Sequence, residues 1–176
     1  MVSMNAITGA TRVARAWKVL AEVPDPEVPA ISVCDLGVVR NVIDGGEMLE
    51  VVLTPTYSGC PATEVIERSI VEAIHAAGLG PVRVSLQRAP AWTTDWISER
   101  GRLRLKDYGI APPGAQQISS QRPVRFVRTQ SKVHSPACPR CGSADTEMLS
   151  SFGSTACKAL CRCVSCREPF EYFKPI

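Results

Sequence analysis

The chain has 176 residues, of which 45% are hydrophobic and 21% are charged, and its formal net charge is +3. This composition is typical of a soluble globular protein with room for one ordinary domain and a small appendage, and it excludes a fibrous or wholly disordered chain. The net charge is too small to indicate nucleic-acid binding. No apolar run approaches the roughly 18 residues that a membrane span needs.

Residues 1–17 lack the continuous apolar stretch of a secretory signal, so we expect a cytoplasmic protein. In that reducing compartment, paired cysteines usually bind metal or take part in redox chemistry. Cys34 and Cys60 stand alone in the first 137 residues, and six of the eight cysteines lie between Cys138 and Cys166. We therefore expect two regions with different sources of stability.

The N-terminal part of the chain alternates between helical and extended patterns. Apolar residues at helical spacing predict a helix over residues 9–23, with Thr11 as its N-cap. The three prolines within residues 24–30 end it, because proline fixes φ and lacks a backbone donor. Residues 36–54 predict a β-hairpin that turns at the sequence DGG.

Helical periodicity resumes after Cys60 and predicts a helix over residues 61–77. An alternating stretch predicts a strand over residues 82–87, and residues 93–109 predict a capped helix. A right-handed crossover through the first of these helices would place the strand in the same sheet as the hairpin. The order of elements predicts an α+β domain over residues 9–110, with a small mixed sheet covered by helices.

Residues 111–136 predict a basic linker. The segment has no acidic residue and four basic ones: Arg122, Arg125, Arg128 and Lys132. A solvated connector explains such a charge run, and docking to an acidic partner surface is the alternative. The sequence VRFVR in its middle would suit a short strand of the region that follows.

Two Cys-x2-Cys pairs, Cys138/Cys141 and Cys163/Cys166, are separated by 21 residues. Two such loops can present four thiolates to one tetrahedral ion, so residues 137–176 predict a four-cysteine zinc ribbon. A region this short needs the metal, because it cannot bury enough apolar surface to offset its ordering entropy. The alternative to zinc is an iron ion bound by the same four cysteines, because tetrahedral thiolate sites accept iron as well.

Three other residues bear on this ligand assignment. We interpret Cys157 and Cys161 as buried thiols of the ribbon, although Cys161 could replace a neighbouring cysteine as a ligand. His134 stands four residues before Cys138, but four cysteines already complete a zinc site.

Cys60 lies between Gly59 and Pro61, at the head of a predicted helix. If Pro61 is the first helical residue, Cys60 lies at or beside the N-cap, where the positive end of the helix favours the thiolate. The competing interpretation is a small residue packed in a tight turn. The spacing favours neither.

The motifs of several enzyme classes are missing from the sequence, which has no phosphate-binding loop, dinucleotide fingerprint or nucleophile elbow. With only His75 and His134 in the chain, Cys60 has no obvious general base, which disfavours a catalytic thiol. Glu72 and His75 form half of a di-iron signature, whereas a carboxylate di-iron centre needs two such pairs. The residues therefore disfavour a catalytic role for this chain.

Four long segments resemble the PaaD (PaaJ) family of bacterial phenylacetate degradation: DPEVPAISVCDLGVV, TPTYSGCPATEVI, PAWTTDWISERGRLRLKDYGIAPP and CPRCGSADTEMLSSFGSTACKALCRCVSCREPFEYFKPI. The N-terminal domain of that family is similar to SufT-like metal–sulfur cluster assembly domains. The resemblance implies an accessory role in phenylacetyl-CoA epoxidation, through assembly or delivery of iron or a labile iron–sulfur cluster. It also implies zinc at the four ribbon cysteines.

The partners implied by this resemblance are the di-iron oxygenase subunit of the epoxidase and its reductase, which carries an iron–sulfur cluster and a flavin. The implied iron or cluster site has five residues: Asp25, Glu27, Asp35, Thr54 and Cys60. Without the resemblance, we would interpret Asp25 and Glu27 as loop caps. Cys34 and Cys161 depart from the family pattern, which predicts valine and an aromatic residue there, and we interpret both as incidental.

A resident cluster needs about four thiolates, and the N-terminal domain offers one well-placed cysteine. A cluster held by Cys60, shared across a homodimer and completed by other ligands, would be incompletely caged and easy to pass on. The alternative function is a structural or electron-transfer subunit of the oxygenase complex, with the ribbon as a docking module. Neither function involves nucleic acid or a membrane.

Overall fold

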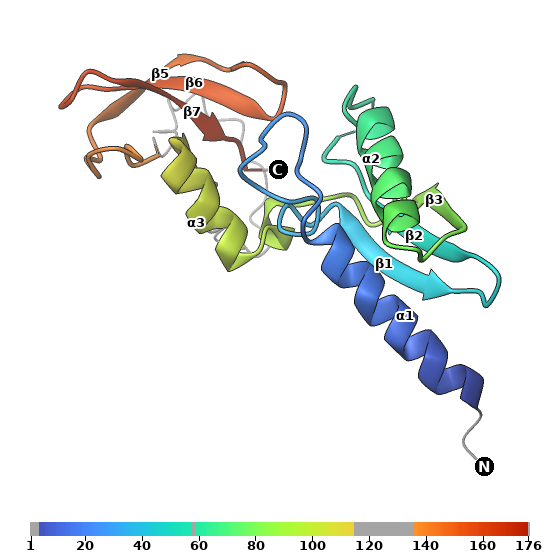
Figure 1. Ribbon diagram of the computed structural model, residues 1–176. Helices are drawn as coiled ribbons and strands as arrows, with labels where there is room; N and C mark the ends of the chain where they lie inside the picture. Colours follow the sequence, from blue (N-terminus) through green and yellow to red (C-terminus); the bar gives the residue numbers. More distant parts are fainter. Residues whose placement is uncertain (1–3, 58, 115–135, 176) are drawn as a thin grey trace, which may run out of the picture. The chain divides into compact units, whose positions relative to one another are not determined.

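The computed structural model describes residues 4–57, 59–114 and 136–175 (Figure 1). The chain divides into two compact units, residues 1–104 and residues 105–176, and each has a sheet of its own. Among the described residues, no helix combines the length and the apolar character that crossing a membrane requires. The predicted α+β fold with a C-terminal ribbon is confirmed.

The sheet of the first unit has three strands in the order β1-β2-β3. They are β1 (Val39–Asp44), β2 (Leu49–Leu53) and β3 (Val82–Leu86). β1 and β2 form the predicted antiparallel hairpin, and β3 runs parallel to β2. The predicted mixed sheet is therefore present, and the helix after Cys60 provides the crossover between its parallel strands.

Two helices, α1 (Met4–Leu20) and α2 (Thr63–Ala76), contact this sheet and each other. On α2 the three isoleucines at four-residue spacing are buried, as the periodicity predicts: Ile66, Ile70 and Ile74. On β2 the alternate residues Leu49, Val51 and Leu53 are buried on one face of the sheet. The core of this unit therefore lies between the two helices and that face.

The ends of α1 differ from the prediction. The helix is already formed at Met4, so Thr11 lies inside it and is not the N-cap, because threonine is tolerated within a helix at modest cost. The helix ends at Leu20, earlier than predicted. Val23 then donates to the carbonyl of Leu20 in a turn, since the residue before Pro24 avoids helical geometry.

The helix predicted over residues 93–109 is two elements. A 3₁₀ turn covers Thr94–Trp96, and α3 covers Glu99–Tyr108. Ile97 between them is extended, and Ser98 caps α3 by accepting a 2.9 Å hydrogen bond from the N–H of Gly101. Because Ser98 caps the helix through its hydroxyl oxygen, its hydroxyl hydrogen remains to be donated to another group.

The sheet of the second unit has the order β4-β7-β6-β5. Its strands are β4 (Ile110–Ala111), β5 (Thr146–Ser150), β6 (Lys158–Cys163) and β7 (Pro169–Phe173). β5, β6 and β7 pair antiparallel, and β4 pairs parallel with β7. This sheet carries the ribbon.

Ala111, the first residue of the predicted linker, is a strand residue of the ribbon sheet. Residues 115–135 lie outside the described residues, and with them the four basic side chains of the linker and His134. The domain limits 9–110, 111–136 and 137–176 stay predictions.

Candidate metal centre and cluster-binding loop

Four thiols from two loops converge in the ribbon. The Sγ atoms of Cys138, Cys141, Cys163 and Cys166 all lie within 4.8 Å of one another. The Sγ atoms of Cys138 and Cys166 are 3.8 Å apart, and those of Cys141 and Cys163 are 3.5 Å apart. Four sulfurs bound tetrahedrally to zinc at 2.3 Å would be about 3.8 Å apart. The predicted ligand set therefore fits one tetrahedral metal ion.

The two cysteine loops turn in the same way. Each is followed by a residue in the left-handed region, Gly142 with φ 76° and Arg167 with φ 64°. In the first loop the N–H of Gly142 donates to the carbonyl of Cys138 over 2.9 Å. In the second the N–H of Cys166 donates to the Sγ of Cys163 over 3.5 Å. These turns point both thiols of each loop to one side.

Local hydrogen bonds also bias the protonation of these thiols. The backbone hydrogen bond from Cys166 lowers the pKa of the Cys163 thiol to about 6. A backbone hydrogen bond from Glu168 lowers the pKa of the Cys166 thiol, but burial and the neighbouring thiols outweigh that effect and raise this pKa to about 12. A metal ion that bound these cysteines would displace the protons from their thiols.

Cys157 and Cys161 lie outside this cluster. They are 4% and 0% exposed, and the Cys157 Sγ is 3.0 Å from the Oγ1 of Thr155. Cys161 shares the buried face of β6 with Ala159 and Cys163, and burial raises its pKa. Both are buried thiols of the ribbon, as predicted from the sequence.

Asp35, in the loop before β1, is 4% exposed and fastens that loop to the start of α3. The Ser98 Oγ donates to its Oδ1 over 2.6 Å, the Arg100 Nε lies 3.0 Å from its Oδ2, and Arg104 lies 3.6 Å from the same oxygen. Burial disfavours the carboxylate, but the hydrogen bonds from Ser98 and Arg100 hold the pKa of Asp35 below its usual value. Sequence reasoning missed Ser98 and Arg100, since neither is near Asp35 in the chain.

Asp25 closes a turn after α1. Its Oδ1 accepts hydrogen bonds from the N–H groups of Glu27 at 2.9 Å and Val28 at 2.8 Å. Its own N–H donates to the carbonyl of Ile31, and the side chain is buried. These are the contacts of a loop cap. A role for Asp25 or Glu27 as an iron ligand stays a prediction.

Thr54 follows β2 and is 2% exposed. Its N–H donates to the carbonyl of Val38 over 2.8 Å, but its Oγ1 has no hydrogen-bond partner among the described residues. An unsatisfied buried hydroxyl costs about 1–3 kcal/mol. The end of β2 therefore holds a polar group that the described contacts leave unsatisfied.

Cys60 is half-buried in the loop between β2 and α2. The N-cap of α2 is Ala62, so Cys60 stands two residues before the cap and not beside it, because Pro61 and Ala62 form a turn before the first helical residue. The N–H of Cys60 donates to the carbonyl of Tyr57, and its carbonyl accepts from the N–H of Thr63. The backbone of Cys60 is thus held by hydrogen bonds on both sides, and the residue as a whole is only half-buried.

The predicted cluster residues lie in two loops. Asp25, Glu27 and Asp35 lie between α1 and β1, and Thr54 and Cys60 follow β2. Within the described parts of the chain, the ligand atoms of Asp25, Glu27, Asp35 and Cys60 do not form a group of three or more close enough to hold one ion, as the ribbon cysteines do. A shared ligand set at these five positions stays a prediction.

Cys34 is half-buried beside Asp35. Burial and the Asp35 carboxylate raise its pKa to about 12, although Arg100 opposes the shift. The interpretation of Cys34 as incidental stays a prediction.

The family model described as iron-sulfur cluster assembly protein matches residues 14–86, and the model described as PaaD zinc beta ribbon domain matches residues 122–174. A crystal structure of a DUF59 domain from Bacillus anthracis has the same fold, with a TM-score of 0.52 and 21% identity over 57% of this chain and 96% of that one. The fold and the four-cysteine centre thus define a cluster-assembly-type domain joined to a zinc ribbon.

The chain is 51% identical over 160 residues to an Escherichia coli K12 protein whose name describes it as a subunit of a "Putative 1,2-phenylacetyl-CoA epoxidase", and the match covers 91% of each chain. It therefore belongs to the PaaD family. It is also 34% identical over 90 residues to a Porphyromonas gingivalis W83 protein named "Fe-S protein maturation auxiliary factor", which covers 50% of this chain and 85% of the relative.

Proposed function

We propose that this protein is a cytoplasmic accessory factor of phenylacetate catabolism that assembles or delivers iron or an iron–sulfur cluster for phenylacetyl-CoA epoxidase. One observation carries the proposal. A cluster-assembly domain over residues 14–86, which includes Cys60, lies in a chain that is 51% identical to a protein named as an epoxidase subunit. The recipient would be the di-iron oxygenase subunit or the iron–sulfur flavin reductase, and the protein would not itself turn over substrate.

Cys60 is the proposed point of attachment for the cargo, because the residue is only half-buried while its backbone is held by hydrogen bonds to Tyr57 and Thr63. A cluster is normally held by about four thiolates, so cargo held through one cysteine per chain would leave readily. Such lability suits transfer to another protein and would be a defect in an electron carrier.

The other predicted residues would support this loop in different ways. The carboxylates of Asp25 and Asp35 already accept hydrogen bonds within the fold, which supports a positioning role for both. The unsatisfied Oγ1 of Thr54 supports a place nearer the cargo. Glu27 completes the predicted set of oxygen ligands.

We further propose that the ion of the ribbon is zinc in a structural role, held by Cys138, Cys141, Cys163 and Cys166. A closed set of four thiolates suits a structural zinc ion, and the metal would stabilise a unit too small to fold well without it. Iron bound by the same thiolates is the alternative that metal analysis distinguishes.

Anaerobic metal and sulfide analysis with absorption spectra, on the wild type and on Cys60→Ala, tests the cargo proposal. We expect one zinc per chain in both proteins, with iron and labile sulfide in the reconstituted wild type alone. If neither protein takes up iron under any reconstitution condition, Cys60 is a turn residue and the proposal fails.

A second candidate function is a non-catalytic subunit of the oxygenase complex, in a structural or electron-transfer role. The name of the Escherichia coli relative, which calls that protein a subunit of the epoxidase, favours it. Epoxidase components that are already loaded with metal can be assayed with and without this protein. Full activity without it eliminates the subunit role, and activity that requires it in every turnover eliminates a pure maturation role.

A further inference from the structure

In the described residues of the first unit, one face of the three-stranded sheet carries exposed and half-buried side chains. α1 and α2 pack on the side of Leu49 and Val51, so the intervening residues of β2 point the other way. On that side Ile43 of β1, Glu50 of β2 and Arg83 of β3 stand in one row across the sheet. We call this the outer face.

The outer face carries both apolar area and charge. Ile43 of β1 is 43% exposed, and Met48, just before β2, is 41% exposed. Glu50 and Arg83 form an ion pair between adjacent strands, with 2.7 Å between Oε2 and Nη2. Their side chains are 22% and 63% exposed, so the guanidinium stays accessible to a second acceptor.

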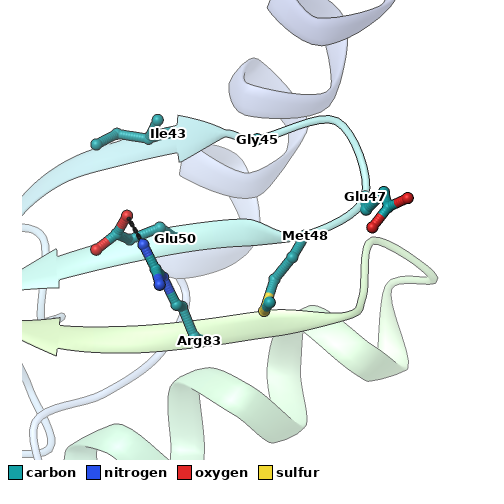
Figure 2. A pocket seen from close by; sticks show the side chains of 6 residues that line it. All are labelled: Ile43, Gly45, Glu47, Met48, Glu50 and Arg83. Carbon is teal, nitrogen blue, oxygen red and sulfur yellow. Dashed lines mark hydrogen bonds and ion pairs between the residues drawn. The ribbon is translucent and has the colours of Figure 1, made fainter.

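A hollow of about 240 Å³ opens on this face, lined by Ile43, Gly45, Glu47, Met48, Glu50 and Arg83 (Figure 2). Its lining has two carboxylates and one guanidinium, together with the apolar side chains of Ile43 and Met48. It is thus suited to the side chain of an arginine, whose stem is apolar and whose head is cationic. Figure 2 shows the ion pair between Glu50 and Arg83, and Glu47 in the loop before β2.

We propose that the outer face binds a second copy of this chain, with the two sheets face to face. In this arrangement, a two-fold axis lies between the two sheets, parallel to the strands and midway between β2 and β3. Because Glu50 and Arg83 lie in register on these two strands, the axis places Glu50 opposite Arg83 of the partner subunit, and the reverse pair forms by symmetry. The hollow beside Ile43 and Met48 then receives the guanidinium side chain of the second copy.

The charges on the outer face favour a second copy of this chain as the binding partner. A face with a carboxylate and a guanidinium side by side is complementary to its own two-fold copy, whereas a purely basic or purely acidic partner would meet one like charge. The apolar side chains that flank the pair would lose their exposure to water in the same step. The interface does not involve Cys60 or the ribbon cysteines. A test of this interface is therefore independent of the proposed delivery function.

Analytical ultracentrifugation of the full-length, zinc-loaded protein over a concentration series tests the proposal. We expect the wild type to dimerise, and we expect Glu50→Arg and Arg83→Glu each to weaken self-association by about tenfold or more, since each creates a face of like charges. An equimolar mixture of these two variants presents one basic and one acidic face. It should therefore form heterodimers where neither variant associates alone.

Charge reversals on α2, Arg68→Glu and Glu72→Arg, are the matched controls and should leave the dimer unchanged. Circular dichroism and zinc content check that each variant is folded. A wild type that stays monomeric at about 200 µM overturns the proposal, and so does a mixture of the variants that fails to associate. Dimerisation that survives both single reversals would place the interface on another surface and also overturns it.

Discussion

The Ser98 hydroxyl donates a 2.6 Å hydrogen bond to the buried carboxylate of Asp35, across 63 residues of sequence. The same hydroxyl oxygen accepts from the N–H of Gly101, so one side chain both caps α3 and anchors it to the loop before β1. Arg100 adds its Nε to the same carboxylate. This connection holds the start of α3 against the loop that precedes the sheet.

Replacement of Asp35 by asparagine should destabilise the first unit by about 1–3 kcal/mol, because it weakens charge-assisted hydrogen bonds at a buried site. The lower part of that range is expected, since Arg100 is half-exposed and solvent screens its charge. All three tryptophans of the chain, Trp17, Trp92 and Trp96, lie in this unit, so their fluorescence in urea follows its unfolding.

The exposed Asp95→Asn is the control and should leave the unfolding midpoint unchanged. If Asp35 only positions the loop, the Asp35→Asn variant will still take up cargo through Cys60 at low denaturant. Loss of iron uptake in a variant that remains folded would instead make Asp35 a ligand.

The same carboxylate predicts how stability depends on pH. The pKa of Asp35 is lowered in the folded protein, so the unfolded chain binds its proton more readily than the folded chain. The stabilisation is therefore complete above the unfolded pKa of about 3.9 and disappears as the pH falls through the lower, folded pKa. Urea midpoints measured from pH 6 to pH 3 should decline more steeply for the wild type than for Asp35→Asn. Parallel declines would contradict this assignment.

Replacement of Gly101 by alanine should destabilise the first unit, although alanine is more favourable than glycine inside a helix by about 1 kcal/mol. A Cβ at this position would lie 2.9 Å from the carbonyl oxygen of Asp35 and 2.9 Å from the Cδ1 of Ile31. The backbone contact cannot give way without moving the loop. We therefore expect Gly101→Ala to lower the urea midpoint. A stabilised variant would show that the loop moves freely, and the anchoring role of Ser98 would then need revision.

These contacts show where sequence reasoning succeeds and where it stops. The buried isoleucines of α2 and the four ribbon cysteines were predictable, because their spacing alone brings them to one face or one ion. The network of Asp35 was not, since polar contacts between distant segments leave no periodic signal. Ser98 even lay inside a predicted helix, and its capping role required the extended Ile97 before it.

The head of α2 illustrates the same limit more locally. Proline before a helix fits the first helical position but equally fits a preceding turn, and the structure has the turn, with Ala62 as the N-cap. Cys60 was correctly placed in a loop between β2 and α2, whereas its relation to the helix end was wrong. Pro61 and Ala62 thus separate Cys60 from the first helical residue, Thr63, whereas one of the two interpretations of Cys60 placed it at or beside the N-cap.

The ribbon offers a matched pair of cysteines on one strand for the last prediction. Cys163 and Cys161 lie two residues apart on the buried face of β6, both 0% exposed, but only Cys163 belongs to the four-thiol cluster. Cys163→Ala should lose the metal, and with it stabilisation on the order of 10 kcal/mol, so that the strands of the ribbon unfold. Cys161→Ala should keep one equivalent of metal and cost about 1 kcal/mol for a small cavity. Metal content, and proteolysis within residues 136–175, measure both effects. If Cys161→Ala loses the metal and Cys163→Ala keeps it, Cys161 is the fourth ligand. A general packing effect would not explain that result, because both residues lie on the same buried face of β6.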